Sequence, residues 1–249
     1  MFITLTMLVI GLICGFVGVG GAGFIIAILV LFHIPIHTAL GTSLAAMAFT
    51  TLSGAYSHLR EGNISLKAGV WTGGFGAIAA FFGSKLSSLI PSEHLHYLTA
   101  GMLFLSAILF ILRFFMMKGK VEEVIDETLG YPTLLVKALL LGMTTGLLSG
   151  AFGIGSAPFI QIGLMLLFGL SIRQSIGTTM LVILPIAAGG GFGYIMEGYL
   201  DLMLLFQVLA GTMAGAYLGA KLTKFAPKPV LKTAMVATPV VAALLILFE

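Results

Sequence analysis

The sequence predicts an all-α, polytopic membrane protein built from two homologous repeats. Three observations predict this fold: the composition, a duplication along the chain, and one glycine-broken apolar segment at the start of each half. Of the 249 residues, 59% are hydrophobic and 8% are charged, whereas a soluble domain carries about 25% charged residues. Too few polar side chains are present to cover a water-soluble globule, so most of the surface must face lipid.

The two halves of the chain match at a nearly constant offset. It is 135 residues around the glycine-rich stretches and 136 after one inserted residue. The matched pieces are GFVGVGGAGF (15–24) with GAFGIGSAPF (150–159), LGTS (40–43) with IGTT (176–179), Glu61-Gly62 with Glu197-Gly198, GSKL (83–86) with GAKL (219–222), and Pro91 with Pro227. A fixed period of this kind indicates repeated structural units. We expect one transmembrane domain over 1–249, with repeats 1–117 and 132–249 joined by the charged connector 118–131.

Each half contains four long apolar segments. They run over 2–33, 38–59, 66–90 and 94–117, and over 132–169, 174–195, 201–223 and 229–248. Six of them suit a single crossing, because a hydrocarbon core of ~30 Å needs about 20 helical residues. The first segment of each half is too long for one crossing.

Glycines interrupt both of these long first segments near the middle. In the first repeat, the arm 2–17 would be ~24 Å long as a helix and the arm 24–33 only ~15 Å. Neither arm spans a membrane comfortably. We therefore predict that each repeat has a re-entrant hairpin with its tip at mid-membrane, followed by three transmembrane helices.

The distribution of Lys and Arg favours an inverted orientation of the two repeats. If segment 2–33 crossed once, these residues would divide six against six between the two sides. If it folds back, the division is eleven against one, with Lys85 alone on the outer side. Cytoplasmic loops carry the excess of Lys and Arg. This predicts external termini and a cytoplasmic connector. We separately expect a multi-pass protein of the cell membrane, in a bacterial or archaeal inner membrane.

The glycine breaks are candidates for an anion site. Non-helical backbone at membrane depth is tolerated where it is buried in protein or lines a polar cavity. A half-helix begins after each break with unpaired N–H groups, and Pro158 is placed like a first helical residue, where proline is favoured. Two such N-termini meeting at the midplane would bind an anion. The alternative is that the glycines only permit close helix packing.

Hydroxyl and amide side chains add to this candidate site. Gly41-Thr42-Ser43 and Gly177-Thr178-Thr179 open the segment after each hairpin; their hydroxyls either donate to substrate oxygens or satisfy backbone groups of a first helical turn. Gln161 either donates to substrate or bonds to a neighbouring helix. The predicted substrate-binding residues are Gly18, Gly20, Gly21, Gly23, Thr42, Ser43, Gly153, Gly155, Ser156, Gln161, Thr178 and Thr179.

The ionisable residues argue against several other kinds of site. All nine acidic residues fall near segment ends, in loops or in the connector, whereas an ion-coupled pump usually needs one inside a span. Glu61-Gly62 and Glu197-Gly198 fit helix C-termini. Cys14 is the sole cysteine, and the histidines show no metal-ligand spacing. We expect no metal and no cofactor, and we do not favour proton handling by His58.

Taken together, the two glycine breaks, the GTS and GTT openings and the HLREGNI turn (58–64) make the chain resemble the sulfite exporter TauE/SafE family. This family is also described as toluene sulfonate uptake permeases, and the likeness covers essentially the whole chain. The resemblance implies transport of small sulfur-containing or carboxylic anions, two homologous halves and no cofactor. Ser156 and Pro158 replace Gly21 and Gly23 in the second break, so a site shared between the halves is asymmetric.

We therefore expect an exporter of sulfite or organosulfonates, with the lipid bilayer and a small anion as its partners and no nucleic acid. Its size is compatible with a homodimer. A monoanion leaving a cell that is negative inside gains ~2.3 kcal/mol per 100 mV. The alternatives are an anion-selective channel, a permease for carboxylates or other organic anions, and a sensor without transport. An enzyme would need a nucleophile with a well-placed base, so no catalytic residue is expected.

Overall fold

The computed structural model describes residues 2–18, 22–116, 130–153 and 156–247, and the regular structure in these ranges is entirely helical. The expected connector therefore lies outside the described residues, apart from its last two positions. The helices are α1 (Phe2–Val17), α2 (Ala22–Leu31), α3 (Ile36–Arg60), α4 (Leu66–Ser87), α5 (Ser92–Met116), α6 (Tyr131–Phe152), α7 (Ala157–Leu167), α8 (Ile172–Met196), α9 (Leu202–Thr223) and α10 (Lys228–Leu247).

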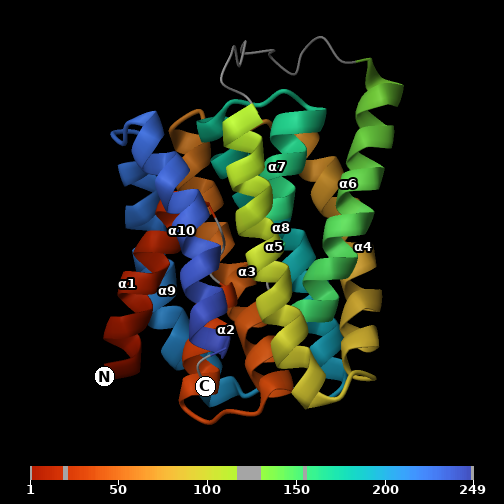
Figure 1. The fold of residues 1–249 in the computed structure, drawn as a ribbon, viewed down its shortest axis with the longest axis vertical. Helices are drawn as coiled ribbons and strands as arrows, with labels where there is room; N and C mark the ends of the chain where they lie inside the picture. The colour runs from red at the N-terminus through yellow and green to blue at the C-terminus, as the bar shows by residue number, and fades with distance from the viewer. Residues whose placement is uncertain (1, 19–21, 117–129, 154–155, 248–249) are drawn as a thin grey trace.

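Each of the two overlong apolar segments forms a pair of helices that turns back inside the molecule (Figure 1). α1 starts at the end where both chain termini lie and stops near the middle, and α2 returns to the same end. α6 starts at the opposite end, and α7 returns there. The two hairpins thus enter from opposite ends, and α1 and α6 both end inside the molecule.

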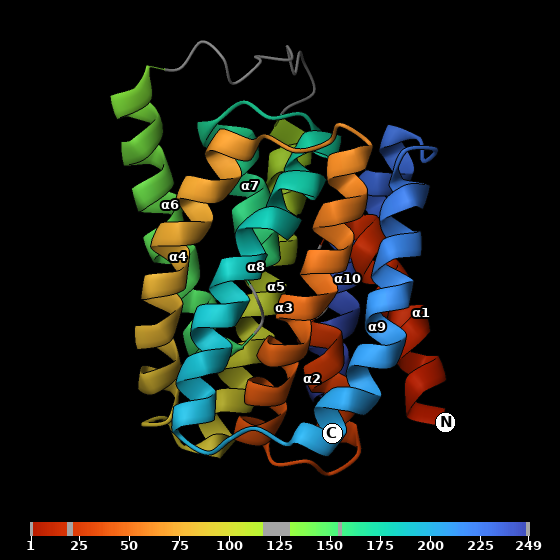
Figure 2. The ribbon, with the colours of Figure 1, turned by 180° about the vertical axis from the view of Figure 1, so that it is seen from behind.

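The remaining helices run the length of the molecule. Seen from behind, the order across it is α6, α4, α8, α3, α9 and α1, each packed on the next (Figure 2). α5 and α10 pack together on the other side. Over the described residues, α6, α8, α9 and α10 are long and apolar enough to cross a membrane. This is consistent with a polytopic membrane protein, although hydropathy alone marks fewer spans than the six single crossings expected.

Glycines set the close packing of α1 on α9 and of α6 on α4. A Cβ on Gly15 would collide with the carbonyl oxygen of Ala216, and one on Gly150 with that of Ala80. On α9, a Cβ on Gly219 would collide with the carbonyl oxygen of Leu12 in α1. On α4, a Cβ on Gly83 would collide with that of Leu147 in α6. Small residues that allow such backbone approach are the usual basis of helix association in lipid. Close packing is therefore established for these glycines, which lie beside the breaks.

Two helix ends agree with their sequence signals. Glu61 and Glu197 are the C-caps of α3 and α8. Gly62 and Gly198 follow with φ of +71° and +79°, the left-handed conformation that glycine adopts after a helix. The prediction that these Glu-Gly pairs end helices is confirmed.

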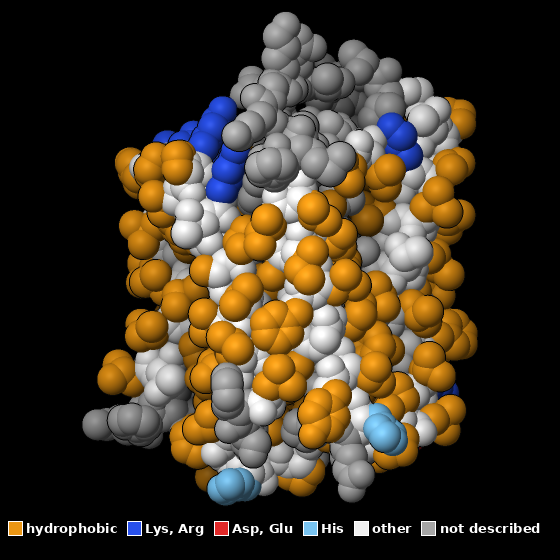
Figure 3. Space-filling view, viewed as in Figure 1, with side chains coloured by type: hydrophobic (Ala, Val, Ile, Leu, Met, Phe, Trp, Pro, Cys, Tyr) orange, Lys and Arg blue, Asp and Glu red, His pale blue; other side chains and the backbone are white. Residues whose placement is uncertain are grey.

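The basic side chains gather at the end of the molecule from which α6 starts (Figure 3). Among the described Lys and Arg side chains, Arg60, Lys67, Lys137, Arg173, Lys221, Lys224, Lys228 and Lys232 lie on helices or loops of that end. Lys85, at the end of α4, lies at the other end. Apolar side chains cover the face between the ends (Figure 3). This asymmetry is the one that folded-back first segments predict.

Candidate substrate site

Each hairpin break begins with a glycine held against a long helix of the other half. Gly18 has φ of +74° and Gly153 has φ of +65°, a region that L side chains rarely occupy. A Cβ on Gly18 would meet the carbonyl oxygen of Ile176 in α8, and one on Gly153 would meet the Leu40 side chain in α3. Both glycines therefore have a structural reason to be glycine. Predicted site residues Gly20, Gly21 and Gly155 lie outside the described residues.

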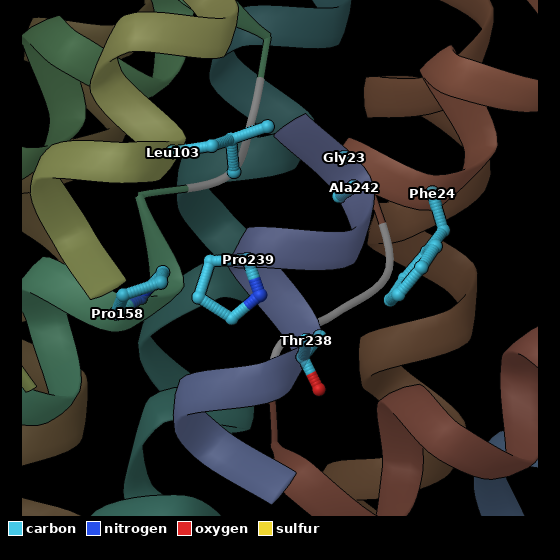
Figure 4. A pocket seen from close by; sticks show the side chains of 7 residues that line it. All are labelled: Gly23, Phe24, Leu103, Pro158, Thr238, Pro239 and Ala242. Atoms are coloured by element: carbon cyan, nitrogen blue, oxygen red, sulfur yellow. The ribbon is translucent and has the colours of Figure 1, made fainter. Parts of the chain in front are cut away.

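The two half-helices that follow the breaks start on either side of a small cavity (Figure 4). Its volume is about 10 Å³, and it is lined by Gly23 and Phe24 of α2, Pro158 of α7, Leu103 of α5 and Thr238, Pro239 and Ala242 of α10. The Thr238 hydroxyl donates to the carbonyl oxygen of Ala234. The cavity holds a single water at most and is apolar, so it is not itself an anion site in this conformation.

The start of α7 differs from the expectation by one residue. Ser156 is the N-cap, with φ of +45°, and Ala157 is the first helical residue. Pro158 is therefore the second helical position and not the first. Its missing N–H still costs nothing, because the first four N–H groups of a helix have no intrahelical partner.

Two of the predicted hydroxyls join one half of the chain to the other. Thr178 Oγ1 accepts a hydrogen bond from the Ser65 backbone N–H at 2.9 Å, and Thr42 Oγ1 accepts one from the Asp201 N–H at 3.4 Å. Ser65 and Asp201 are the N-caps of α4 and α9. These threonines therefore hold the starts of neighbouring helices. Ser43 Oγ donates within its own helix, to the Leu40 carbonyl.

A second matched pair of contacts holds the inner ends of α1 and α6. His58 Nε2 lies 3.2 Å from the carbonyl oxygen of Gly15, and the Tyr194 hydroxyl donates to that of Gly150 at 3.1 Å. Carbonyls in the last turn of a helix lack intrahelical partners, which explains why side chains can bind them. Tyr194 was not singled out from the sequence, although its offset of 136 from His58 was available as a signal.

Gln161 links the two breaks. Its Nε2 donates to the carbonyl oxygens of Val17 at 2.8 Å and Gly18 at 3.1 Å, where α1 ends. Of the two roles considered from the sequence, the structure has the amide nitrogen bonding across to a neighbouring helix. The amide oxygen Oε1 is buried and has no hydrogen-bond partner among the described residues.

Three of the predicted residues keep a buried polar atom without a partner in the described part of the chain: Ser156 Oγ, Gln161 Oε1 and Thr179 Oγ1. Ser149 Oγ, near the end of α6, is a fourth. Buried polar groups nearly always have a hydrogen-bond partner. Four such atoms near the second break make it the candidate place for a polar ligand.

Helix geometry places Thr179 beside the second break. Ser175 Oγ donates to the carbonyl oxygen of Gln161, so this face of α8 contacts α7. Thr179 lies one turn further along the same face. α7 and α8 run in opposite directions (Figure 1), so Thr179 is level with the start of α7 and with Ser156.

The first break has no polar side chain at the positions equivalent to Ser156 and Gln161. Gly21 stands at the position of Ser156 and Ile26 at that of Gln161, by the offset of 135. Ser43 corresponds to Thr179 but its hydroxyl is used within α3. Among the predicted site residues that the structure describes, those with a free buried polar atom therefore lie in the second half.

The described charged side chains lie toward the ends of the molecule. Lys224 Nζ pairs with Glu61 Oε2 at 2.9 Å, and Arg173 donates to the Ala226 carbonyl. Within the described residues, no group of three His, Cys, Asp or Glu side chains is placed to hold a metal ion. The polar groups near the breaks are neutral, so a bound anion would rely on hydroxyls, N–H groups and the helix dipole.

The comparisons with known proteins agree with transport. The family described as "Sulfite exporter TauE/SafE" matches residues 3–246. A Bacillus subtilis (strain 168) protein named "Probable membrane transporter protein YdhB" is 63% identical over the full length of both chains. "Probable membrane transporter protein YjnA" of the same organism is 27% identical, covering 91% of this chain and 92% of its own.

A more distant organism contributes a similar match. "Probable membrane transporter protein MJ0441" of Methanocaldococcus jannaschii is 27% identical over 88% of this chain and 85% of its own length. No solved structure gives a significant match. The family and the names of these relatives indicate a membrane transporter and not an enzyme.

Proposed function

We propose a substrate class and a direction for the transport carried out by this chain, which belongs to the sulfite exporter TauE/SafE family. The protein exports small sulfur-containing anions, such as sulfite or an organosulfonate, across the cell membrane. The anion binds at mid-membrane beside the second hairpin break. Membrane potential drives its exit.

The observation that carries this proposal is the group of free polar atoms at the start of α7. Ser156 and Thr179 each offer a buried hydroxyl without a partner among the described residues. The N-terminus of α7 adds main-chain N–H groups and the positive end of a helix dipole. Hydroxyls and N–H groups at a helix N-terminus are the usual donors to oxyanions. Carboxylates would meet the same donors, so they belong in the same substrate panel.

We further propose that the two halves are inverted repeats that exchange conformations during transport. The support is that equivalent contacts occur twice: Thr42 with Asp201 and Thr178 with Ser65. The hairpins also enter from opposite ends (Figure 1). In such folds, substrate binds near the midplane at the interface of the repeats, and alternating access follows from rocking one unit against the other.

The basic end is proposed to face the cytoplasm, as the excess of Lys and Arg favours. Export of a monoanion from a cell that is negative inside is then favoured by ~2.3 kcal/mol per 100 mV, or roughly fifty-fold. No coupling ion is needed for that direction.

The test is the flux of radiolabelled sulfite and sulfoacetate in proteoliposomes under an imposed potential. We expect saturable flux that follows the potential and shows counterflow. Hydrogen bonds to charged groups contribute about 1.5–3 kcal/mol. Ser156→Ala should therefore lower kcat/KM by about ten- to a hundred-fold.

The matched control is Thr144→Val. Thr144 is an exposed residue of α6 whose hydroxyl donates to Leu140 of its own helix, so flux should be unchanged. Unaltered flux in Ser156→Ala would move the site elsewhere. Flux that neither saturates nor shows counterflow would indicate a channel, and flux of carboxylates alone would change the substrate class.

A further inference from the structure

Gln161 presents an acceptor, not a donor, to the space between the breaks. Its Nε2 must face the Val17 and Gly18 carbonyl oxygens, because those two acceptors need a donor. If the amide were rotated by 180°, Gln161 Oε1 would face the carbonyl oxygens of Val17 and Gly18, and the three oxygens would repel one another. The orientation of Oε1 is therefore fixed by the chemistry of its neighbours, and an amide oxygen can only accept.

The amide of Gln161 lies beside the proposed anion site. Helix side chains lean toward the helix N-terminus, and Gln161 lies in the second turn of α7, four residues after Ala157. Its amide reaches the end of α1 from there. The side chain is fully buried, and Oε1 has no partner in the described ranges of the chain. A buried acceptor without a donor destabilises the protein unless a ligand supplies the donor.

A ligand that satisfies the Ser156 and Thr179 hydroxyls, the first N–H groups of α7 and Gln161 Oε1 must carry several hydrogen-bond acceptors and one donor. Anionic oxygens would accept from Ser156, Thr179 and the first N–H groups of α7. A fully deprotonated oxyanion would place one more acceptor against Gln161 Oε1, whereas an oxyanion that retains an O–H would donate to it. Sites built to bond a substrate O–H reject analogues that lack it.

We propose that Gln161 selects a protonated monoanion, hydrogen sulfite in the case of sulfite, over the corresponding dianion. The O–H of the anion donates to Gln161 Oε1 while its other oxygens accept from the start of α7. This inference rests on the proposed function and specifies which form of the substrate is carried. It also makes each transport event move a single negative charge.

Several titratable groups of the described residues lie near this point and must be controlled for, among them Tyr194 of α8, whose hydroxyl donates to the Gly150 carbonyl. On α1, Cys14 is buried one turn before Gly18. On α3, His58 contacts Gly15. Lys137 of α6 and Arg173 of α8 bond to Leu167 and Ala226 at the basic end.

The experiment measures KM for total sulfite in proteoliposomes across the pH range in which hydrogen sulfite gives way to the dianion. KM of the wild-type protein should rise by about tenfold per pH unit once the dianion predominates, because the monoanion is diluted by that factor. His58→Gln retains a donor for the Gly15 carbonyl and cannot titrate, so its KM should follow the same profile. A flat or falling wild-type profile overturns the proposal.

Two substitutions at Gln161 separate its acceptor from its donor. The Gln161→Lys change would keep N–H donors for Val17 and Gly18 and remove the acceptor, so KM should cease to rise with pH. Gln161→Glu keeps the acceptor oxygens, so the preference for hydrogen sulfite should persist. A Gln161→Lys profile that matches the wild type, in protein that elutes as a single species, overturns the proposal. Absence of saturable sulfite flux at every pH contradicts the proposed function instead.

Discussion

Adjacent threonines in α8 have different surroundings, and this difference separates structural from ligand-binding hydroxyls. Thr178 Oγ1 accepts from the N–H of Ser65, the N-cap of α4. Thr179 Oγ1 is buried and has no partner among the described residues. Both are Thr with fully buried side chains, so each serves as the control for the other.

Thr178→Val should destabilise the protein, because the Ser65 N–H then loses its acceptor at a cost of about 1–3 kcal/mol. KM for the transported anion should change little. Thr179→Val should leave the unfolding temperature near that of the wild type and raise KM by about tenfold or more. Thermal unfolding in detergent and flux in proteoliposomes measure the two effects. The opposite pattern, with Thr178 controlling KM, would exchange the assigned roles.

The sequence alone identified candidate site residues but not their hydrogen-bond partners. The matched breaks and the GTS and GTT openings identified Ser156 and Thr179 as candidates, and Gln161 was a candidate because it is an amide within an apolar stretch. It could not show that Thr42 and Thr178 bond to Asp201 and Ser65, because those contacts join residues 113 or 159 positions apart across the two halves. From the sequence alone, a hydroxyl that bonds to a neighbouring helix cannot be distinguished from one that is free to bind a ligand.

At the level of helices, glycine has two uses that the structure separates. In α4, Gly83 lies where an added Cβ would collide with the Leu147 carbonyl of α6, while Gly74 faces open space. The first position is needed for close packing and the second is not. Sequence spacing placed the breaks within the two long segments and the Glu-Gly helix ends, but it could not tell which glycines pack against which helix.

Gly83→Ala should therefore destabilise the protein by about 1–3 kcal/mol, since overpacking a tight contact has that cost. Gly74→Ala in the same helix should be neutral or stabilising by up to ~1 kcal/mol, because alanine favours helix. Unfolding midpoints of the purified proteins in one detergent provide the comparison. Equal effects of the two substitutions would show that the α4–α6 contact is looser than the structure has it.

At the scale of the whole molecule, the charge distribution and the direction of the hairpins lead to the same orientation. Both chain termini and the end of α4 that carries Lys85 lie at one end, and the helix ends and loops that carry the other described Lys and Arg residues lie toward the opposite end (Figure 1). The sequence predicted this grouping because a hairpin reverses the side on which every later loop falls. The sequence also predicted that the breaks lie at mid-membrane, but no pattern in it supplied their neighbours, which come from α3 and α8: Gly153 faces Leu40 and Gly18 faces Ile176.

Orientation in the membrane is testable with two exposed positions at opposite ends. Leu89, in the loop after α4, and Phe225, in the loop after α9, are each 78% exposed. Cys14 is buried and is the chain's sole cysteine, so Cys14→Ala supplies a background for single substitutions. If the basic end faces the cytoplasm, Leu89→Cys should react with a membrane-impermeant maleimide on intact cells. Phe225→Cys should react only after permeabilisation. The reverse labelling would place the basic end outside, and the membrane potential would then oppose anion movement from the basic end toward the other.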